Sequence, residues 1–483
     1  MLRRLFVLVT AMLSAFSASA QSAAPTPPMG WNSWDAYGLT ITEAQFRANA
    51  KVLHDKLLPY GWRYAVIDEG WFLENPQDRP HPDKLIYEID PPGRYVPVPA
   101  RFPSAVKSGT VTGYAGSAPK LPATIQETSF KPLADWVHAQ GLLFGIHIVR
   151  GIPRASVERN LPIAGSTFHA QDAADTSDAC GWDPTNWGVK DNAAGQAWYD
   201  ALIQQYAGWG VDLLKVDCIA DHPYKVSEIR QIRRAIDKSG RRIVLSLSPG
   251  PTNPSHAAEV ASLANMWRIS NDFWDLWSGG NGPDGFPQSL KGQFDRLAAW
   301  SQPELKFNLK PGQWPDADML PFGELRPSPG WGEPRHTRLT LDEQKTVMTL
   351  WSITQSPLIL GANLTELDDA TLKLLTNPEV LAIDQHAVVR GRPMQDTNTS
   401  DVRIWRAELA PAQPGGDTRL VLALFNLSDK PLDIAGSVIE AEFLRPGKSH
   451  ARAVLDVWSG EVAPGLEPVR RIPPHGCLLL EQR

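Results

Sequence analysis

The sequence predicts a (β/α)8 TIM barrel followed by a small C-terminal antiparallel β-sandwich domain. From residue 29 to about 363, short β-branched or aromatic runs alternate with segments of helical periodicity, and eight such units are present. Alternating strands and helices form parallel sheets, and eight units favour a closed barrel. A doubly wound open sheet is the alternative, but no Gly-x-Gly-x-x-Gly loop follows the first strand to support it.

The predicted strands of the barrel are short apolar or aromatic runs that end next to polar residues. They cover residues 29–34, 63–68, 142–149, 211–217, 242–248, 265–270, 306–309 and 355–360. Helical periodicity between them predicts helices at 43–57, 130–140, 194–209, 226–239 and 342–351. We therefore expect a barrel domain at residues 25–388.

The pattern changes after about residue 388, where strand-like runs follow one another with no helix-period segment between them. These runs cover residues 403–409, 420–427, 453–457 and 477–481, and Pro- and Gly-rich turns separate them. Consecutive strands joined by turns form antiparallel sheets. We therefore expect an antiparallel β-domain at residues 389–483, without an intervening helix.

The first 20 residues are typical of a signal peptide. Arg3 and Arg4 provide a basic start, residues 5–16 form an apolar run, and Ala18-Ser19-Ala20 is a small-residue cleavage site. The apolar run is too short to span a bilayer, so we expect a cleaved leader and no membrane partner after cleavage. This predicts a secreted or periplasmic protein. Outside the cytoplasm Cys180 and Cys218 could form a disulfide, although buried thiols are equally compatible with the sequence.

The composition narrows the possible partners. A net charge of −6 and a pI near 6.0 argue against binding nucleic acid or an anionic membrane. The 18 tryptophans are high for 483 residues, and they serve either as core residues or as the flat apolar walls of a sugar-binding cleft. The sequence carries no signal that fixes the oligomeric state.

Two aspartates, Asp217 and Asp272, close strand-like runs on different predicted strands. A carboxylate at the end of a buried apolar run is costly and is rarely placed there for packing alone. Because barrel enzymes place catalytic groups at the carboxyl ends of their strands, these two can meet at one bond. Paired carboxylates are the basic equipment of a glycoside hydrolase.

Other polar and aromatic residues lie at the same ends of the predicted strands. They are Trp31, Trp34, Asp68, Glu69, His147, Arg150, Lys215, Ser248, Arg268, Asp316 and Asp318. Structural alternatives exist: Lys215 and Arg268 could neutralise buried carboxylates, and His147 could be a core histidine. Asp316 and Asp318 could form a turn. The sequence has no metal-binding spacing, phosphate loop or Gly-x-Ser-x-Gly elbow, so we expect no metal and no cofactor.

Five motifs, in order, resemble glycoside hydrolase family 27, the α-galactosidase or melibiase family. They are residues 27–34 (Pro-Pro-Met-Gly-Trp-Asn-Ser-Trp), 66–71 (Val-Ile-Asp-Glu-Gly-Trp), 213–217 (Leu-Leu-Lys-Val-Asp), 266–272 (Met-Trp-Arg-Ile-Ser-Asn-Asp) and 315–320 (Pro-Asp-Ala-Asp-Met-Leu). The similarity extends through residues 350–358 and 377–385, and so covers about residues 25 to 390.

The resemblance implies a retaining exo-glycosidase that releases terminal α-D-galactose from oligo- or polysaccharides by double displacement. Asp217 matches the family's nucleophile and Asp272 its acid/base. The remaining expected substrate-binding residues are Trp34 as a pocket wall, Asp68 and Glu69 as acceptors, Lys215 and Arg268 as cations, and His147 and Ser248 on the neighbouring strand ends. Lys215, on the same strand face as Asp217, should favour the charged form of that carboxylate.

Three positions depart from the family pattern. Glu69 stands where α-galactosidases usually carry Asp, and its extra methylene would enter the space of the sugar's C6 hydroxymethyl group. In this family that change is associated with β-L-arabinopyranosidases, whose sugar is galactose without that carbon. His147 replaces a usual Tyr, and residues 247–250 replace a Cys-Glu-Trp-like segment. The alternatives to an α-galactosidase are therefore a β-L-arabinopyranosidase, an α-glucan-directed member and, least favoured, a non-catalytic carbohydrate-binding protein.

Overall fold

The structure is a computed structural model of the 483-residue chain. It describes residues 23–483 except 79–80, 82–83, 107–113, 117–122, 126, 184, 280–284, 302–310, 327–332, 395–400, 415, 444–452 and 464–468. The predicted signal peptide at residues 1–20 lies outside the described part of the chain. Within that part, no helix is both long and apolar enough to cross a membrane.

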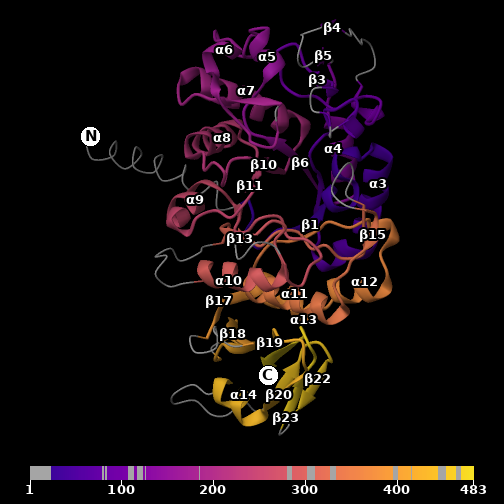
Figure 1. The fold of residues 1–483 in the computed structure, drawn as a ribbon, viewed down its shortest axis with the longest axis vertical. Helices are drawn as coiled ribbons and strands as arrows, with labels where there is room; N and C mark the ends of the chain where they lie inside the picture. The colour runs from indigo at the N-terminus through magenta and orange to yellow at the C-terminus, as the bar shows by residue number, and fades with distance from the viewer. Residues whose placement is uncertain are drawn as a thin grey trace, which may run out of the picture.

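Eight parallel strands form the central sheet, in the order β13-β12-β11-β10-β6-β2-β1-β16 (Figure 1). They are β1 (Met29–Asn32), β2 (Tyr64–Ile67), β6 (Leu143–Val149), β10 (Leu213–Asp217), β11 (Val244–Leu247), β12 (Met266–Arg268), β13 (Trp314–Asp316) and β16 (Leu358–Leu360). Just after β13, Leu320 forms a parallel bridge with Leu360 of β16, and its N–H donates to the Ile359 carbonyl at 2.7 Å. The sheet therefore closes on itself, and the predicted barrel is confirmed.

The seventh strand differs from the prediction. The predicted strand at residues 306–309 lies outside the described residues, whereas the sheet uses β13 (Trp314–Asp316). Pro315 and Asp316 make β13 look unlike a central strand, because proline cannot donate to a strand ladder. The other seven predicted strands overlap observed ones.

Helices surround the barrel and cover its outer face (Figure 1). The predicted ones appear as α3 (Glu43–Val52) continued by the π-turn η3 (Leu53–Leu57), α4 (Lys131–Ala139), α7 (Ala193–Trp209), α8 (Val226–Ser239) and α11 (Leu341–Ile353). Their ends follow local chemistry: Asn192 caps α7 by accepting from the Gly195 N–H at 2.8 Å, and Gly210 ends it in the left-handed conformation.

Further helices have no counterpart among the predictions. They are α2 (Trp34–Tyr37), α5 (Arg154–Glu158), α6 (Ala170–Ala173), α9 (Ala257–Leu263), α10 (Leu290–Trp300), α12 (Asp369–Leu375) and α13 (Pro378–His386), with the 3-10 turns η2 (Gly38–Thr40), η4 (Leu58–Tyr60), η5 (Pro76–Asp78), η7 (Pro103–Ala105), η8 (Pro254–His256) and η10 (Leu364–Glu366). Most span two turns or fewer, which leaves too few residues for a recognisable helical period.

Two long segments leave the barrel at the carboxyl ends of β2 and β6 and form small sheets of their own. The first sheet has the order β3 (Tyr87–Ile89), β5 (Ala123–Ile125), β4 (Tyr114–Gly116), and the second the order β7 (Ile152–Pro153), β9 (Asn186–Val189), β8 (Ala174–Ala179). A third pair, β14 (Glu324–Leu325) and β15 (Arg335–His336), follows β13.

The C-terminal region is antiparallel, as predicted. Its main sheet has the order β17 (Ala387–Pro393), β18 (Val402–Leu409), β19 (Arg419–Asn426), β24 (Cys477–Gln482), β21 (Val454–Asp456), β22 (Glu461–Ala463), and a second sheet pairs β20 (Leu432–Ala435) with β23 (Val469–Ile472). The expectation of no helix here is wrong, because α14 (Gly436–Phe443) follows β20. The buried residues of α14 are Gly436, Ile439 and Phe443, and only the last two carry apolar side chains, which is too few to give a recognisable period.

The main C-terminal sheet is buried on both faces. One face, including Ile404, Leu422 and Leu424, packs with Ile439 of α14 in a core of its own. The other face belongs to the main core: Phe425 meets Phe294 of α10 edge-on, with ring centroids 5.0 Å apart, and α11 contacts β19 and β24. We retain residues 25–388 and 389–483 as the proposed domain limits, with β17 at the junction.

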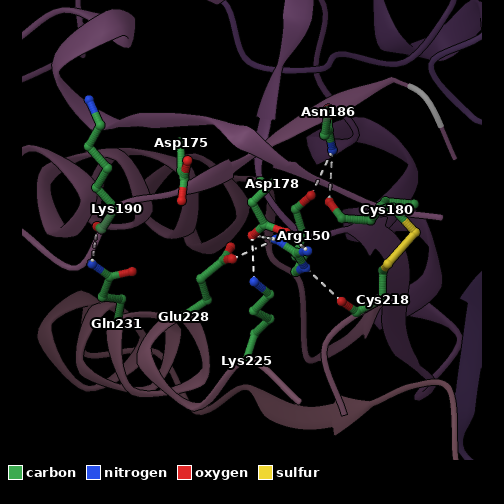
Figure 2. Close-up of polar contacts among 12 residues, drawn as sticks. Arg150, Asp175, Asp178, Cys180, Asn186, Lys190, Cys218, Lys225, Glu228 and Gln231 are labelled. Carbon is green, nitrogen blue, oxygen red and sulfur yellow. Dashed lines mark hydrogen bonds and ion pairs between the residues drawn. A yellow bond between two sulfur atoms is a disulfide. The ribbon is translucent and has the colours of Figure 1, made fainter. Parts of the chain in front are cut away.

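A buried ionic cluster ties three segments together around Arg150, the residue that follows β6 (Figure 2). Its guanidinium pairs with Asp178 of β8 at 2.9 Å and with Glu228 of α8 at 2.7 Å, and its Nε donates to the Cys218 carbonyl at 2.7 Å. Lys225 adds a second cation, 2.8 Å from Asp178. Burial raises the pKa of Glu228, and Arg150 is the cation that opposes this shift.

We expect Arg150→Met to lower the free energy of unfolding by about 3–5 kcal/mol, because it leaves the Glu228 and Asp178 carboxylates without their buried cation. Lys225→Met is the matched control: it removes the other cation of Asp178 from a more exposed position, and about 1 kcal/mol or less should be lost. Urea-induced unfolding of both variants makes the comparison. Equal, small losses would mean that Arg150 does not hold these segments together.

Candidate active site

A cavity of about 730 Å³ opens at the carboxyl ends of the barrel strands. The residues predicted to form the site come to it from five different strands or the loops that follow them. Those that line it are Trp34, Asp68, Glu69, Lys215, Asp217, Ser248, Arg268 and Asp272. The cavity size is that of a small-molecule site rather than a surface depression.

His147 is the expected substrate-binding residue that does not line the cavity, and of the other strand-end candidates Trp31, Arg150 and Asp316 do not line it either, whereas Asp318 does. His147 lies on β6 next to β10, and its side chain is buried. His147 Nε2 lies 3.3 Å from Asp217 Oδ2, so it contacts this carboxylate from within the barrel wall. The histidine is therefore placed to act on Asp217 rather than on a bound molecule.

Asp217, at the end of β10, is held in a polar setting that favours its charged form. Burial alone would raise the pKa of Asp217, but the hydrogen bond and charge of His147, then the charge of Lys215 and the Cys218 N–H, hold it below its ordinary value. The Cys218 N–H donates to Asp217 Oδ1 at 2.6 Å. A charged, partly accessible carboxylate at this position is suited to nucleophilic attack.

The turn after Asp217 has an unusual backbone conformation that two bonds of Cys218 hold in place. Cys218 has a φ of 61°, in the left-handed region that a residue with a side chain rarely adopts. Its sulfur forms a disulfide with Cys180, which the sequence left open, and its carbonyl accepts from Arg150 Nε (Figure 2). These bonds hold the N–H that contacts the Asp217 carboxylate.

Lys215 hydrogen-bonds to Asp68, while its charge also lowers the pKa of Asp217, as its place on the same strand face predicted. Its Nζ lies 2.8 Å from Asp68 Oδ2, which also accepts from Asn32 Nδ2 at 2.6 Å. Burial raises the pKa of Asp68, but Lys215 and His147 hold it well below its usual range, and Asp68 in turn raises that of Lys215. The result is a rigid charged pair on the cavity floor, with Glu69 beside it.

Asp272 lines the cavity from the loop that follows β12, and its side chain is 38% exposed. Arg268 Nη2 donates to Asp272 Oδ1 at 3.1 Å and lies 2.8 Å from Asp318 Oδ2. The Phe273 N–H donates to the same Asp318 oxygen at 2.7 Å. Asp272 is thus the more solvent-accessible of the two carboxyl groups that contact this guanidinium.

Several residues that line the cavity were not predicted from the sequence. Asp35 directly follows Trp34, where an acidic residue in the first turn of a helix is common. Burial, followed by the charge of Asp318, raises the pKa of Asp35 well above its ordinary value. Trp182 lies in the long segment that follows β6, two residues after Cys180 of the disulfide, and Phe286 lies in the loop before α10. Only the tertiary fold brings these aromatic residues to the cavity.

The arrangement suits a polyhydroxylated ligand. Asp217 and Asp272 line one cavity and could act on one bond, the Asp68–Lys215 pair offers fixed acceptors and donors, and aromatic side chains supply apolar walls. Among the described residues, no group of three or more His, Cys, Asp or Glu side chains is placed to hold a metal ion.

Comparisons with known proteins agree with this site. The family model described as alpha galactosidase A matches residues 188–386. The chain is 38% identical to a variant of a family GH27 β-L-arabinopyranosidase from Geobacillus stearothermophilus, solved in complex with arabinose, covering 96% of this chain and 98% of that one with a TM-score of 0.80. An alpha-galactosidase A from Cellvibrio japonicus is 26% identical over 488 residues, or 98% of this chain and 96% of that protein.

An alpha-galactosidase of Cyamopsis tetragonoloba is also 26% identical, over 464 residues that cover 94% of this chain and 85% of that protein. The match to the Geobacillus enzyme spans nearly the whole of both chains at 38% identity, so it covers the barrel, the cavity and the C-terminal sheets together. This chain belongs to glycoside hydrolase family 27, and it is a glycosidase.

Proposed function

We propose that the protein is an exported, retaining exo-glycosidase that removes terminal β-L-arabinopyranose residues from oligo- or polysaccharides. The observation that carries this choice of sugar is Glu69, a buried carboxylate that lines the cavity beside Asp68. The relative at 38% identity, which is named as a β-L-arabinopyranosidase, supports it. α-D-Galactose, placed first from the sequence, becomes the second candidate.

In the proposed mechanism Asp217 attacks the anomeric carbon while Asp272 protonates the leaving oxygen. This gives a covalent glycosyl-enzyme, and a water molecule deprotonated by Asp272 then releases the sugar with its anomeric configuration retained. The lowered pKa of Asp217 supports its role, because a nucleophile must be charged at working pH. The partial exposure of Asp272 supports its role as acid/base, because an acid/base must reach both the leaving group and water.

The sugar ring would be held on the floor and walls of the cavity. Asp68 and Lys215, fixed by their mutual 2.8 Å contact, would bond to hydroxyl groups without first having to be ordered. Trp34 would pack against the apolar face of the ring. His147 acts through Asp217, and Ser248 lies on the rim formed by β11 and the residues that follow it.

Glu69 would select the sugar by size. β-L-Arabinopyranose and α-D-galactose present the same groups around the reacting carbon, and they differ by the C6 hydroxymethyl group. Because Glu is one methylene longer than Asp, its carboxylate would occupy the space that the hydroxymethyl group needs. A single methylene in a pocket changes specificity by about 10- to 200-fold.

α-D-Galactose remains the second candidate because the curated relatives at 26% identity are named as α-galactosidases. The same catalytic groups would serve either sugar. An α-glucan substrate rests only on the altered residues at His147 and 247–250. A purely binding protein is disfavoured, because Asp217 and Asp272 are both present in the cavity.

Export is proposed from the leader-like residues 1–20. The Cys180–Cys218 disulfide supports an oxidising compartment, where such bonds persist. The protein would then act outside the cytoplasm, either in a periplasm or after release.

The test compares hydrolysis of p-nitrophenyl β-L-arabinopyranoside and p-nitrophenyl α-D-galactopyranoside by the wild type, Glu69→Asp and Glu69→Gln. We expect the wild type to favour the arabinoside. Glu69→Asp should shift the ratio of kcat/KM values toward the galactoside by about 10- to 200-fold, because it frees room for one hydroxymethyl group.

Glu69→Gln is the matched control, since it keeps the length of the side chain and should keep the preference for the arabinoside. Asp217→Asn should abolish turnover of both substrates. A wild type that clearly favours the galactoside would show that Glu69 does not crowd C6, and the second candidate would replace the first.

A further inference from the structure

One nitrogen of Arg268 serves more acceptors than it has hydrogens. Arg268 Nη2 lies 3.2 Å from the Ser270 carbonyl, 3.1 Å from Asp272 Oδ1 and 2.8 Å from Asp318 Oδ2. A terminal guanidinium nitrogen carries two hydrogens, so these three oxygens compete for them. Arg268 Nε is buried and has no hydrogen-bond partner among the described contacts, so it does not relieve the competition.

The surroundings of Asp318 hold more negative than positive charge. Arg268, Asp272 and Asp316 interact with it from β12, the following loop and β13, and Asp35 and Lys215 from α2 and β10. The two cations among these residues are Arg268 and Lys215, and Lys215 already bonds to Asp68. Full ionisation of both Asp272 and Asp318 would therefore place two negative charges against one guanidinium, which favours retention of one proton by the pair.

We propose that Asp318 is a positioning residue for Asp272: the two carboxyl groups both contact Arg268 Nη2 and retain one proton between them, and Asp318 fixes the backbone beside Asp272 through the Phe273 N–H. This inference rests on the proposed function, in which Asp272 is the acid/base. Asp318 competes for the cation that would otherwise stabilise the charged form of Asp272. Asp318 thereby makes retention of one proton by the pair more favourable than it would be for a single carboxyl group beside Arg268.

The geometry and electrostatics of Asp318 agree with this role. Its side chain is 6% exposed, against 38% for Asp272. Burial, then the charges of Asp272 and Asp316, raises the pKa of Asp318 to about 7, against the opposing effects of Arg268 and the Phe273 N–H. These neighbours favour retention of one proton by the Asp272–Asp318 pair.

The backbone of Asp318 is also held in an unusual conformation. Its φ of 83° lies in the left-handed region, which is uncommon for a residue with a side chain. Asp316 Oδ1 accepts from the Asp318 N–H at 2.9 Å, and Trp351 Nε1 donates to the Asp318 carbonyl at 2.9 Å. These bonds hold the chain in a conformation that places the carboxyl group between Arg268 and Phe273, and such constrained residues cluster at active sites.

The test is the pH dependence of kcat/KM for Asp318→Asn, which keeps the shape of the side chain and removes its charge. Arg268 Nη2 would then contact one carboxylate instead of two, which relieves the charge crowding that favours retention of a proton by the pair. We expect the alkaline limb of the profile to move to lower pH by about 1–2 units. Asp316→Asn is the comparison variant: Asp316 accepts from the Asp318 N–H and its charge raises the pKa of Asp318, but among the described contacts it has none with Arg268 Nη2, so the limb should move by less than in Asp318→Asn.

If the wild type is active, two results would overturn the inference and leave the proposed function intact. The first is an alkaline limb that does not move in Asp318→Asn, and the second is a limb that Asp316→Asn moves by the same amount. A second readout does not depend on turnover or on the folding of Asp318→Asn. Carbon-13 NMR titration of aspartate carboxyl groups should show that Asp272→Asn lowers the pKa of Asp318, and an unchanged value overturns proton sharing. A wild type that hydrolyses neither glycoside contradicts the proposed function, while this titration still decides whether the pair shares a proton.

Discussion

Crowded negative charge at the mouth of the barrel is the constraint on which the site depends. Six carboxyl groups line one cavity, whereas its fixed cations are Lys215 and Arg268. So many buried carboxylates cannot all be ionised without partners, and the neighbours of each carboxyl group therefore determine its protonation state. Asp68 is held charged by Lys215, Asp217 by His147, and burial favours the neutral form of Asp35. Chemically identical side chains thereby acquire different roles.

The scaffold around Asp217 keeps this charge arrangement in place. Parallel strands bring β6 and β10 into register, so that His147 lies opposite Lys215 and next to the end of the strand that carries Asp217. Beyond the strand end, the disulfide and Arg150 fix Cys218 by its sulfur and its carbonyl, and its N–H contacts the carboxylate. The C-terminal sheet packs on the barrel through Phe425 and α11, on the side of the main core.

Much of the fold could be predicted because barrel strands and long helices have local patterns. β13 could not be predicted, because its Pro315 and Asp316 are untypical of a central strand, and α14 is too short to show a helical period. The strand-end residues of the site were predictable for a geometric reason: parallel strands of a closed sheet deliver their carboxyl ends to one rim.

The contacts between side chains of the site were harder to predict than the places of these residues at the strand ends. Lys215 and Asp217 share a strand face, yet Lys215 bonds to Asp68, 147 positions away in the sequence. Trp182 and Phe286 enter the cavity from loops that carry no periodic signal, and Asp35 resembles an ordinary helix start. Which side chains meet across a barrel depends on register and on loop paths, and neither is written in local sequence.

Trapping of a glycosyl-enzyme decides whether Asp217 is the nucleophile. The wild-type protein would be incubated with an activated fluorinated glycoside of the preferred sugar, whose intermediate hydrolyses slowly, and then analysed by intact mass and peptide mapping. The mechanism predicts a mass gain of one glycosyl unit, located on Asp217. A stoichiometric label on any other carboxylate, such as Asp68 or Glu69, would contradict it.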